Sequence, residues 1–217
     1  MSIKDEYFIK PINYETAEDV VVKCHYAHRK ASCVYAFGLY SKKPLKLRGV
    51  IIYGIPASDF VCKGVCGVEE RENVYELTRL YVDDGLPKNL ESYFISHTIK
   101  QLDREIIVSY SDTAYNHVGV VYQATNFIYT GLGHSQKDPV SNDNKHNRHN
   151  TNTIKDNGYV VRSPKHRYVY FNCDRRRKRI LTQKLRWKIQ PYPKATQPVP
   201  ITSTVNIDDT KRKNRLF

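Results

Sequence analysis

Polar side chains cluster directly after a short apolar run near the middle of this 217-residue chain. Residues 106–110, IIVSY, are typical of a buried strand, and Ser109, Asp112, His117 and Tyr122 lie on it or shortly after it. In open α/β sheets, ligands bind beyond the carboxyl ends of the strands. A carboxylate there can act as a base, orient a histidine or bind a metal, and an imidazole can titrate near neutral pH. Asp112 can equally cap the helix that follows, and both interpretations remain open.

A second group of residues, 83–92 (DDGLPKNLES), joins a strand to an amphipathic helix predicted for residues 89–102. The first turn of a helix presents unpaired N–H groups and the positive end of the helix dipole, which together suit a phosphate. Lys88 adds positive charge and Ser92 a hydroxyl. The alternative is an ordinary turn in which Asn89 only caps the helix, since the segment has neither a GxGxxG nor a Walker motif.

Two further segments could carry chemistry. Residues 25–29, HYAHR, end a helix that begins near Asn13. Their two histidines, three residues apart, can share a helix face and bind a metal, or they can simply complement the helix dipole. Glu76 and Arg79 lie on one strand, residues 74–82, and simple alternation points them to opposite faces. Because charges on a central strand need partners, at least one should face a cavity.

The spacing of apolar residues predicts the elements that position these side chains. Continuous apolar runs at residues 34–40 and 48–55 predict strands covered on both faces. The other predicted elements are strands at residues 6–10, 74–82, 106–110, 127–130, 159–161 and 167–171 and helices at residues 13–25, 89–102, 119–126 and 175–188. Residues 57–73 are interpreted as a loop or short irregular helix, and the Asn- and His-rich residues 132–158 as a long loop. This mixture predicts an α+β fold.

Positive charge is concentrated at the C-terminal end of the chain. Of a net charge of +13, residues 173–217 carry +10, with 13 Lys and Arg against 3 Asp and Glu. Such a block points to a polyanion, most simply nucleic acid, whereas the alternative is a solvated tail that only aids solubility. We therefore predict a domain of residues 1–172, with residues 132–158 as an insertion, and a basic DNA-binding extension of residues 173–217.

Composition disfavours several other classes of protein. The chain has no run of about 18 apolar residues, so no membrane span is expected. The charged start MSIKDEYFIK is unlike a signal peptide, and a cytoplasmic location is expected. The five cysteines are scattered apart from Cys62 and Cys66, which favours free thiols in a reducing compartment over structural zinc.

The predicted order of elements resembles the GNAT acetyltransferase fold, in which the turn after the fourth strand holds the pyrophosphate of acetyl-coenzyme A. Residues 121–127, VYQATNF, resemble the final helix motif of that fold, where a tyrosine, here Tyr122, stands near the thiol leaving group. Asn126 replaces the usual glycine, and asparagine also accepts left-handed dihedrals. The turn departs from the family pattern, because GLPKNLES replaces its glycine-rich motif. The resemblance implies a single GNAT-like domain of α/β/α layers with a mixed central sheet and acetyl-CoA as cofactor.

Within that fold, residues 5–131 are similar to the phage Mom family, whose members modify adenine in DNA at N6 and so protect it from restriction. The motifs are HYAHR (25–29), ELTRL (76–80), PKN (87–89), SYSD (109–112) and GVVYQATNF (119–127), with weaker support from KHRYVY (165–170). The resemblance implies double-stranded DNA as partner, a phage-encoded enzyme in the cytoplasm of a bacterial host, and a base flipped out of the duplex. Tyr26, Tyr110 and Tyr122 are candidates to stack on that base.

Together, spacing and resemblance assign roles to three sets of residues. The predicted catalytic residues are Asp112, Tyr122, His25, Tyr26, Ser109, His117, Glu76 and Arg79. The predicted cofactor-binding residues are Val82, Pro87, Lys88, Asn89, Leu90 and Ser92. The predicted nucleic-acid-binding residues are Arg29, Lys30, Arg175, Arg176, Arg177, Lys178, Arg179, Lys184, Arg186 and Lys188.

A metal is a further expectation, because the Mom product is attached through a CH2 carbon, which ordinary acyl transfer from acetyl-CoA does not explain. Iron or another divalent metal held by His25, Asp112 and His117 would be one way to activate that carbon. Two other functions are compatible with the sequence. One is a conventional GNAT acetyltransferase acting on a protein or small amine, and the other is a non-catalytic DNA-binding protein on a degenerate GNAT scaffold.

Overall fold

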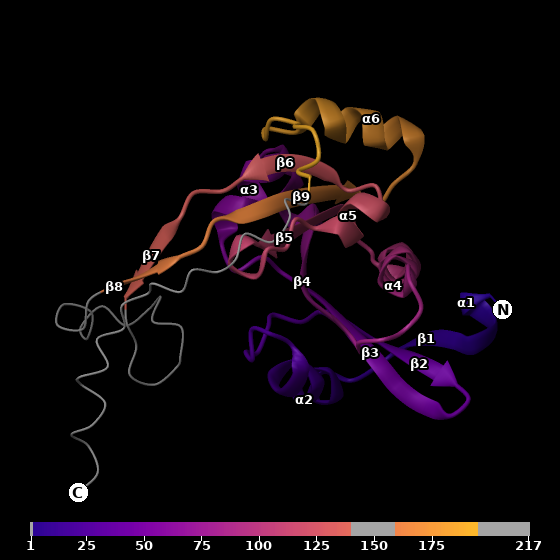
Figure 1. Ribbon diagram of the computed structural model, residues 1–217. Coiled ribbons are helices and arrows are strands. Elements are labelled where there is room, and N and C mark those ends of the chain that lie inside the picture. The colour runs from indigo at the N-terminus through magenta and orange to yellow at the C-terminus, as the bar shows by residue number, and fades with distance from the viewer. Residues whose placement is uncertain (1, 140–158, 195–217) are drawn as a thin grey trace, which may run out of the picture.

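The computed structural model describes residues 2–139 and 159–194. Figure 1 shows a central sheet with helices on both faces and a two-stranded ribbon that projects from one side. The strands are β1 (Tyr7–Pro11), β2 (Tyr35–Lys42), β3 (Leu45–Gly54), β4 (Val74–Val82), β5 (Ile106–Asp112), β6 (Ile128–Leu132), β7 (Gln136–Pro139), β8 (Tyr159–Arg162) and β9 (Lys165–Phe171). The helices are α1 (Ile3–Glu6), α2 (Tyr14–Cys24), α3 (Asp59–Cys66), α4 (Leu90–Thr98), α5 (Val120–Ala124) and α6 (Arg175–Lys184), with 3-10 helices η1 (Val68–Asn73), η2 (Ile99–Gln101) and η3 (Thr113–Tyr115).

The main sheet is mixed. Its seven strands lie in the order β1-β2-β3-β4-β5-β9-β6, and all neighbours are antiparallel except β4 and β5. The parallel pairing covers only four residue pairs and ends at Leu77 and Ser109. Because β4 continues to Val82 and β5 to Asp112, the two strands separate beyond that point. We call this separation the β4–β5 divergence.

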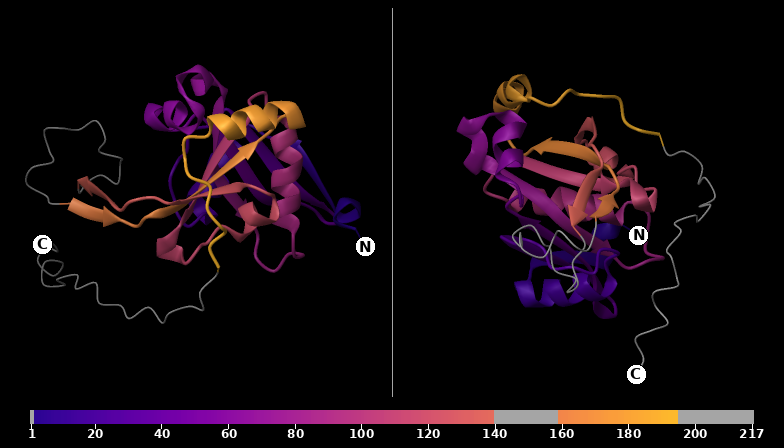
Figure 2. Two further views of the ribbon diagram at one scale, coloured as in Figure 1. Left: turned by 90° about the horizontal axis from the view of Figure 1, so that it is seen from above. Right: turned by 90° about the vertical axis from the view of Figure 1, so that its left-hand side faces the viewer.

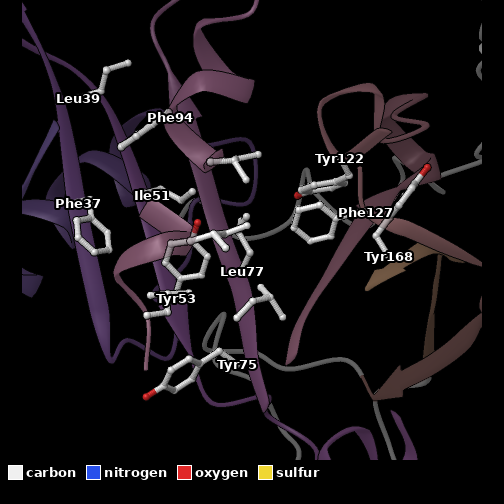
Figure 3. Packing of buried hydrophobic residues seen from close by; sticks show 14 of the residues in the cluster. Phe37, Leu39, Ile51, Tyr53, Tyr75, Leu77, Phe94, Tyr122, Phe127 and Tyr168 are labelled. Atoms are coloured by element: carbon white, nitrogen blue, oxygen red, sulfur yellow. The ribbon is translucent and has the colours of Figure 1, made fainter. Parts of the chain in front are cut away.

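Alternate residues of β3 face two different layers of helices. Val50 and Ile52 are buried in a cluster with α2. Ile51 and Tyr53 are buried on the opposite face in the largest cluster, together with Phe94 of α4 (Figure 3). In the other half of the sheet, α3 and α6 contribute to a third cluster with β5 and β9. The α/β/α layers and the mixed sheet that the sequence predicted are therefore confirmed.

Helix α6 is part of the folded domain. Its Leu181 is fully buried, and the carboxylate of Glu70, a residue only 5% exposed, accepts bonds from Arg177 at 2.6 Å and Lys184 at 2.7 Å. Arg177 also reaches Glu105 at 2.8 Å. We expected a separate extension from residue 173 with these two cations bound to DNA. Arg177 and Lys184 are the cationic partners that the buried Glu70 carboxylate needs within the fold, and their predicted contact with DNA stays a prediction.

Part of the segment predicted as a long loop is a strand. Within residues 132–158, β7 pairs antiparallel with β8, and Figures 1 and 2 show the resulting ribbon projecting away from the sheet. β7 has the sequence QKDP, which lacks the alternation by which strands are usually predicted. Residues 140–158, the rest of the predicted loop, lie outside the described residues.

Other differences from the predicted elements are local. Residues 57–73, interpreted from the sequence as a loop or a short irregular helix, contain the two short helices α3 and η1. The side chain of Asn13 caps α2 by accepting a hydrogen bond from the Thr16 N–H at 3.0 Å. Asn89 precedes α4 with φ of 68° and makes no such cap, whereas Asn126 adopts the expected left-handed conformation with φ of 60°. None of the helices in the described ranges is long and apolar enough to cross a membrane.

Candidate active site

Tyr122 lies at the inner end of the β4–β5 divergence. Gly119 has φ of 70° and a Cβ there would come within 2.6 Å of the Tyr168 ring, so glycine is required where α5 begins. Helix α5 packs the Tyr122 ring against Phe127 and Tyr168, each with centroids 5.3 Å away (Figure 3). Burial raises the pKa of Tyr122, and its interaction with Ser109 opposes this only in part. The phenol is therefore protonated at neutral pH and available as a donor.

A bulge in β4 brings Glu76 and Arg79 to the same face of the sheet. The pairing of β3 with β4 shifts by one residue and skips Thr78. Because a bulge reverses the alternation beyond it, our expectation that the two charges point to opposite faces is wrong. Burial lowers the pKa of Arg79, while the nearby charges of Tyr26 and Glu76 act in the opposite direction.

The guanidinium of Arg79 ties the loop after α2 to β4. Its Nη1 donates to the Thr78 carbonyl at 2.7 Å, and its Nη2 donates to the carbonyls of Arg29 at 3.4 Å and Lys30 at 3.3 Å. The Nε atom is buried and has no hydrogen-bond partner within the described residues. A buried N–H of this kind is costly unless an acceptor reaches it. An acceptor from outside would reach this Nε–H only if the side chain moved, because the atom is not accessible to solvent.

An aromatic cluster lies on the face of the sheet that carries Glu76 and Arg79. It consists of the rings of His25, Tyr26, Tyr115 and His117, and we call it the ring cluster. The Tyr26 ring lies 4.2 Å from His25, 4.3 Å from Tyr115 and 5.6 Å from His117, measured between centroids. Tyr26 is 37% exposed and Tyr115 49% exposed. Of the other tyrosines predicted to stack on a base, Tyr122 is only 8% exposed, and burial raises the pKa of Tyr110, which packs against the apolar cluster of α3 and α6. Tyr26 alone among the three presents an accessible ring.

His25 is a neutral donor in this geometry. It is only 7% exposed, and its Nδ1 accepts the backbone N–H of Ala27 at 3.1 Å. Burial, followed by the charge of Arg79, lowers the pKa of His25 to about 4. At neutral pH the single ring proton is therefore on Nε2, which can donate but cannot act as a base.

Asp112 links the backbone of η3 to the connection between β8 and β9. Its carboxylate accepts the Ala114 N–H at 3.0 Å, the hydroxyl of Ser163, and Lys165 at 3.3 Å. Burial would raise its pKa, but these hydrogen bonds and the charge of Lys165 outweigh burial and lower it. The capping interpretation of Asp112 is thus realised in η3, and the ionised carboxylate also fixes the connection between β8 and β9.

The predicted metal ligands do not form a site. Among residues 2–139 and 159–194, no group of three His, Cys, Asp or Glu side chains is arranged to hold a metal ion. His25 uses Nδ1 for a backbone bond and Asp112 is occupied by three donors. His117 is exposed and meets the ring cluster by ring contacts. The grouping of His25, Asp112 and His117 as metal ligands is therefore corrected.

The turn between β4 and α4 surrounds a hollow of about 250 Å³, lined by residues 82–91. The predicted cofactor-binding residues that line it are Val82, Pro87, Lys88, Asn89 and Leu90. Ser92 does not line it, because its hydroxyl donates back to the Asn89 carbonyl at 2.9 Å.

The charges around this hollow are mixed. Lys88 and the first N–H groups of α4 favour an anion. Asp84 and Glu91 also line it, and burial raises the pKa of Glu91. Asp83 is paired with Arg48 at 3.0 Å. Backbone N–H groups and Lys88 can therefore bind a diphosphate here, whereas the carboxyl groups of Asp84 and Glu91 disfavour it.

The predicted DNA-binding cations fall into two regions. Arg29 and Lys30 lie in the loop bound by Arg79, next to the ring cluster, and Lys30 pairs with Glu18 at 2.5 Å. The others lie on α6 or shortly after it, at the top of Figure 1, whereas α2 is at the bottom: Arg175, Arg176, Lys178, Arg179, Arg186 and Lys188.

Sequence reasoning missed Tyr115 and Glu91. Glu91 is a first-turn residue of a helix, where an acidic side chain is ordinary. Tyr115 lies between the SYSD motif and His117, and that proximity is the only signal that could have indicated it.

Comparison with known proteins gives one family. Residues 6–194 match the model of the Mom protein family. The chain is 28% identical over 208 residues to "Methylcarbamoylase mom" of Escherichia phage Mu, covering 87% of this chain and 84% of that protein.

Solved structures similar to this chain include acetyltransferases. One is NAA60 of Arabidopsis thaliana in complex with acetyl-CoA, which is 12% identical with a TM-score of 0.48 and covers 76% of this chain and 98% of that one. Another is the ribosomal-protein-S5-alanine acetyltransferase from Vibrio fischeri, 14% identical with a TM-score of 0.46, covering 78% of this chain and 94% of that one.

Proposed function

This chain belongs to the Mom protein family, and from that premise we propose that it attaches a methylcarbamoyl group to the N6 amine of adenine in DNA. The observation that carries the proposal is the similarity to the phage Mu methylcarbamoylase across 87% of the chain. The arrangement of Tyr122, Glu76, Arg79 and the ring cluster around the β4–β5 divergence supports it. The expected setting is the cytoplasm of a bacterial host, where phage DNA meets restriction enzymes.

The reaction forms a bond between N6 and the CH2 carbon of the transferred group, while the leaving group departs with its electron pair and takes up the proton that N6 loses. We assign two donors of this chain to that step. They are the protonated phenol of Tyr122 and the Nε2–H of His25. Fixed donors of this kind stabilise negative charge on a leaving group or on an amide oxygen without reorganisation. Asp112 supports them by holding η3 and the β8–β9 connection.

Acetyl-CoA, or another donor carrying a diphosphate, would be held at the hollow after β4. The backbone N–H groups at the start of α4 and the Lys88 side chain would bind the diphosphate. The thiol of acetyl-CoA leaves from the carbonyl carbon, so direct displacement at the CH2 carbon requires a donor that carries its leaving group on that carbon and already bears the amide. Tyr122 is the residue that the family motif puts near the leaving group.

Double-stranded DNA is the proposed macromolecular substrate. The adenine amine is not free to react inside the stack, so the base has to leave the duplex. Phosphate binding is supported by the exposed cations of α6, Arg175, Arg176 and Arg179.

Nucleoside mass spectrometry of DNA from cells that express the chain tests this function. We expect a modified deoxyadenosine with the wild type and a loss of at least about 10-fold with Tyr122→Phe, which removes only the phenolic donor. Phe60→Ala, at a ring that is 88% exposed, is the matched control and should leave the modification unchanged. Unmodified deoxyadenosine in the presence of soluble, folded wild-type protein would refute the proposal.

Conventional acetyl transfer to a protein or small amine is the second candidate, favoured by the hollow after β4. It predicts consumption of acetyl-CoA without DNA. The proposed function predicts that any turnover requires an adenine-containing substrate.

A further inference from the structure

Exposed aromatic rings are few in the described part of the chain, and two of them touch each other. Aromatic side chains that are at least 37% exposed there are Tyr26, Phe60, Tyr115 and Tyr192. The Tyr26 and Tyr115 centroids are 4.3 Å apart. Tyr192 is tied by its hydroxyl to the Phe127 carbonyl at 2.7 Å, and no ring contact involves Phe60 within the described residues. The pair Tyr26–Tyr115 is therefore an exposed aromatic surface that folding alone does not explain.

The turn that carries Tyr115 is fixed before any ligand arrives. Asp112 caps η3 through the Ala114 N–H, and the Thr113 hydroxyl donates to the Pro164 carbonyl at 2.7 Å. Asn116 ends the turn with φ of 53°, and the Ser111 hydroxyl donates to the His117 carbonyl at 2.8 Å. A ring on such a support loses little conformational freedom when a flat ligand stacks on it.

The surroundings of the pair identify the ligand. Behind Tyr26 lies the buried His25, whose Nε2–H can donate a bond, and the guanidinium of Arg79 lies nearby. Beside the pair, the loop containing Arg29 brings positive charge, whereas Lys165 is paired with Asp112. A flat aromatic ligand with hydrogen-bond acceptors on its edge and a phosphate attached to it matches this environment, and a purine nucleotide has all of these features.

Resting on the proposed function, we propose that Tyr115, together with Tyr26, forms the platform on which the extruded adenine stacks. Tyr115 is then a substrate-binding residue that positions the base in front of the β4–β5 divergence. Its hydroxyl is not required, because the stacking depends on the ring alone.

Fluorescence of 2-aminopurine tests the platform without the reaction. An oligothymidylate with one central 2-aminopurine is titrated with full-length protein, and stacking quenches the fluorophore. We expect quenching by the wild type and by Tyr115→Phe, and an affinity for the purine-containing strand that falls about 5-fold to 150-fold with Tyr115→Ala and Tyr115→Leu, the range for one stacked base. Phe60→Ala should bind as the wild type does. Oligothymidylate without the purine should lose less affinity on these substitutions than the purine-containing strand does, because thymine stacks less strongly than a purine.

The outcomes distinguish a failure of the stacking platform from a failure of the proposed function. If Tyr115→Ala and Tyr115→Leu quench like the wild type while cells expressing the wild type contain modified deoxyadenosine, the platform is refuted and the proposed function stands. A similar loss with and without the purine would also refute the platform, since it indicates a structural or phosphate-binding role. If the wild type neither quenches 2-aminopurine nor modifies deoxyadenosine, both proposals fail.

Discussion

His25 couples the ring cluster to the stability of the fold. Its pKa is lowered to about 4 by burial and by Arg79, from an ordinary value near 6.5. Between these values the unfolded chain binds more protons than the folded one, so stability rises with pH through the window and is complete above about 6.5. The wild type should therefore lose up to about 3 kcal/mol of unfolding free energy between pH 6.5 and pH 4.

Urea denaturation at several pH values measures this loss of unfolding free energy. His25→Asn keeps an acceptor near the position of Nδ1 for the Ala27 N–H but cannot titrate, so its stability should change less over the same range. His134→Gln, at an exposed histidine that does not act on His25, is the control and should retain the wild-type slope. An equal slope in His25→Asn would show that other groups carry the effect.

Single residues show where sequence reasoning succeeds and where it ends. Tyr122 was predicted from a local motif, and the glycine and asparagine that flank its helix behave as their types require. Glu76 and Arg79 were placed on opposite faces because alternation contains no information about a bulge at Thr78. The pairing of Tyr26 with Tyr115 depends on two segments that are distant in sequence, which periodicity cannot bring together.

At the scale of elements, Glu70 is the residue that attaches α6 to the domain. Burial alone would raise its pKa, but hydrogen bonds from Lys184 and Arg177 outweigh burial and lower it to about 2. Its stabilising contribution is therefore complete above about pH 4.5 and is lost as pH falls towards 2. Glu70→Gln should cost about 1.5–3 kcal/mol, because it weakens two charge-assisted hydrogen bonds while Arg177 keeps Glu105 as a partner.

Thermal unfolding and limited tryptic digestion measure the loss. Loosening of α6 should release the backbone at the arginines of residues 175–179 from the helix, so tryptic cleavage there should be faster than in the wild type. Glu72→Gln is the matched control, because the Arg71–Glu72 pair has a similar distance of 2.6 Å but Glu72 is 76% exposed. Its effect should stay below about 1 kcal/mol. Equal effects of the two substitutions would contradict the role assigned to Glu70.

The ion pairs of α6 illustrate why the order of the elements could be predicted from the sequence, whereas the contacts between the elements could not. Apolar runs and helical stripes identified most strands and helices of the sheet. The basic sequence of α6 indicated a free, DNA-facing helix, because composition does not show that Glu70 and Glu105 lie opposite it. Likewise, β4 and β5 diverge where their pairing ends, at Leu77 and Ser109, and no residue type in the sequence marks that position.

At the scale of the whole molecule, positive charge divides into cations used by the fold and cations left for DNA. Arg175, Arg176 and Arg179 are exposed on α6, whereas Arg177 of the same helix is bound to two carboxylates. Each phosphate that a cation neutralises steepens the plot of log Kd against log salt concentration by about 0.9 for duplex DNA. Replacing the three exposed arginines by alanine should flatten the slope by about 0.9 for every phosphate that they bind, with weaker binding to all sequences alike.

Arg177→Ala removes the same kind of charge from the same helix and separates the two roles. Because its guanidinium is engaged by Glu70 and Glu105, this variant should unfold at a lower temperature and keep the wild-type salt slope. Fluorescence anisotropy with a labelled duplex at several salt concentrations measures the slopes. A triple variant with an unchanged slope would assign the phosphate contacts elsewhere in the molecule, most directly to the loop of Arg29 and Lys30 beside the ring cluster.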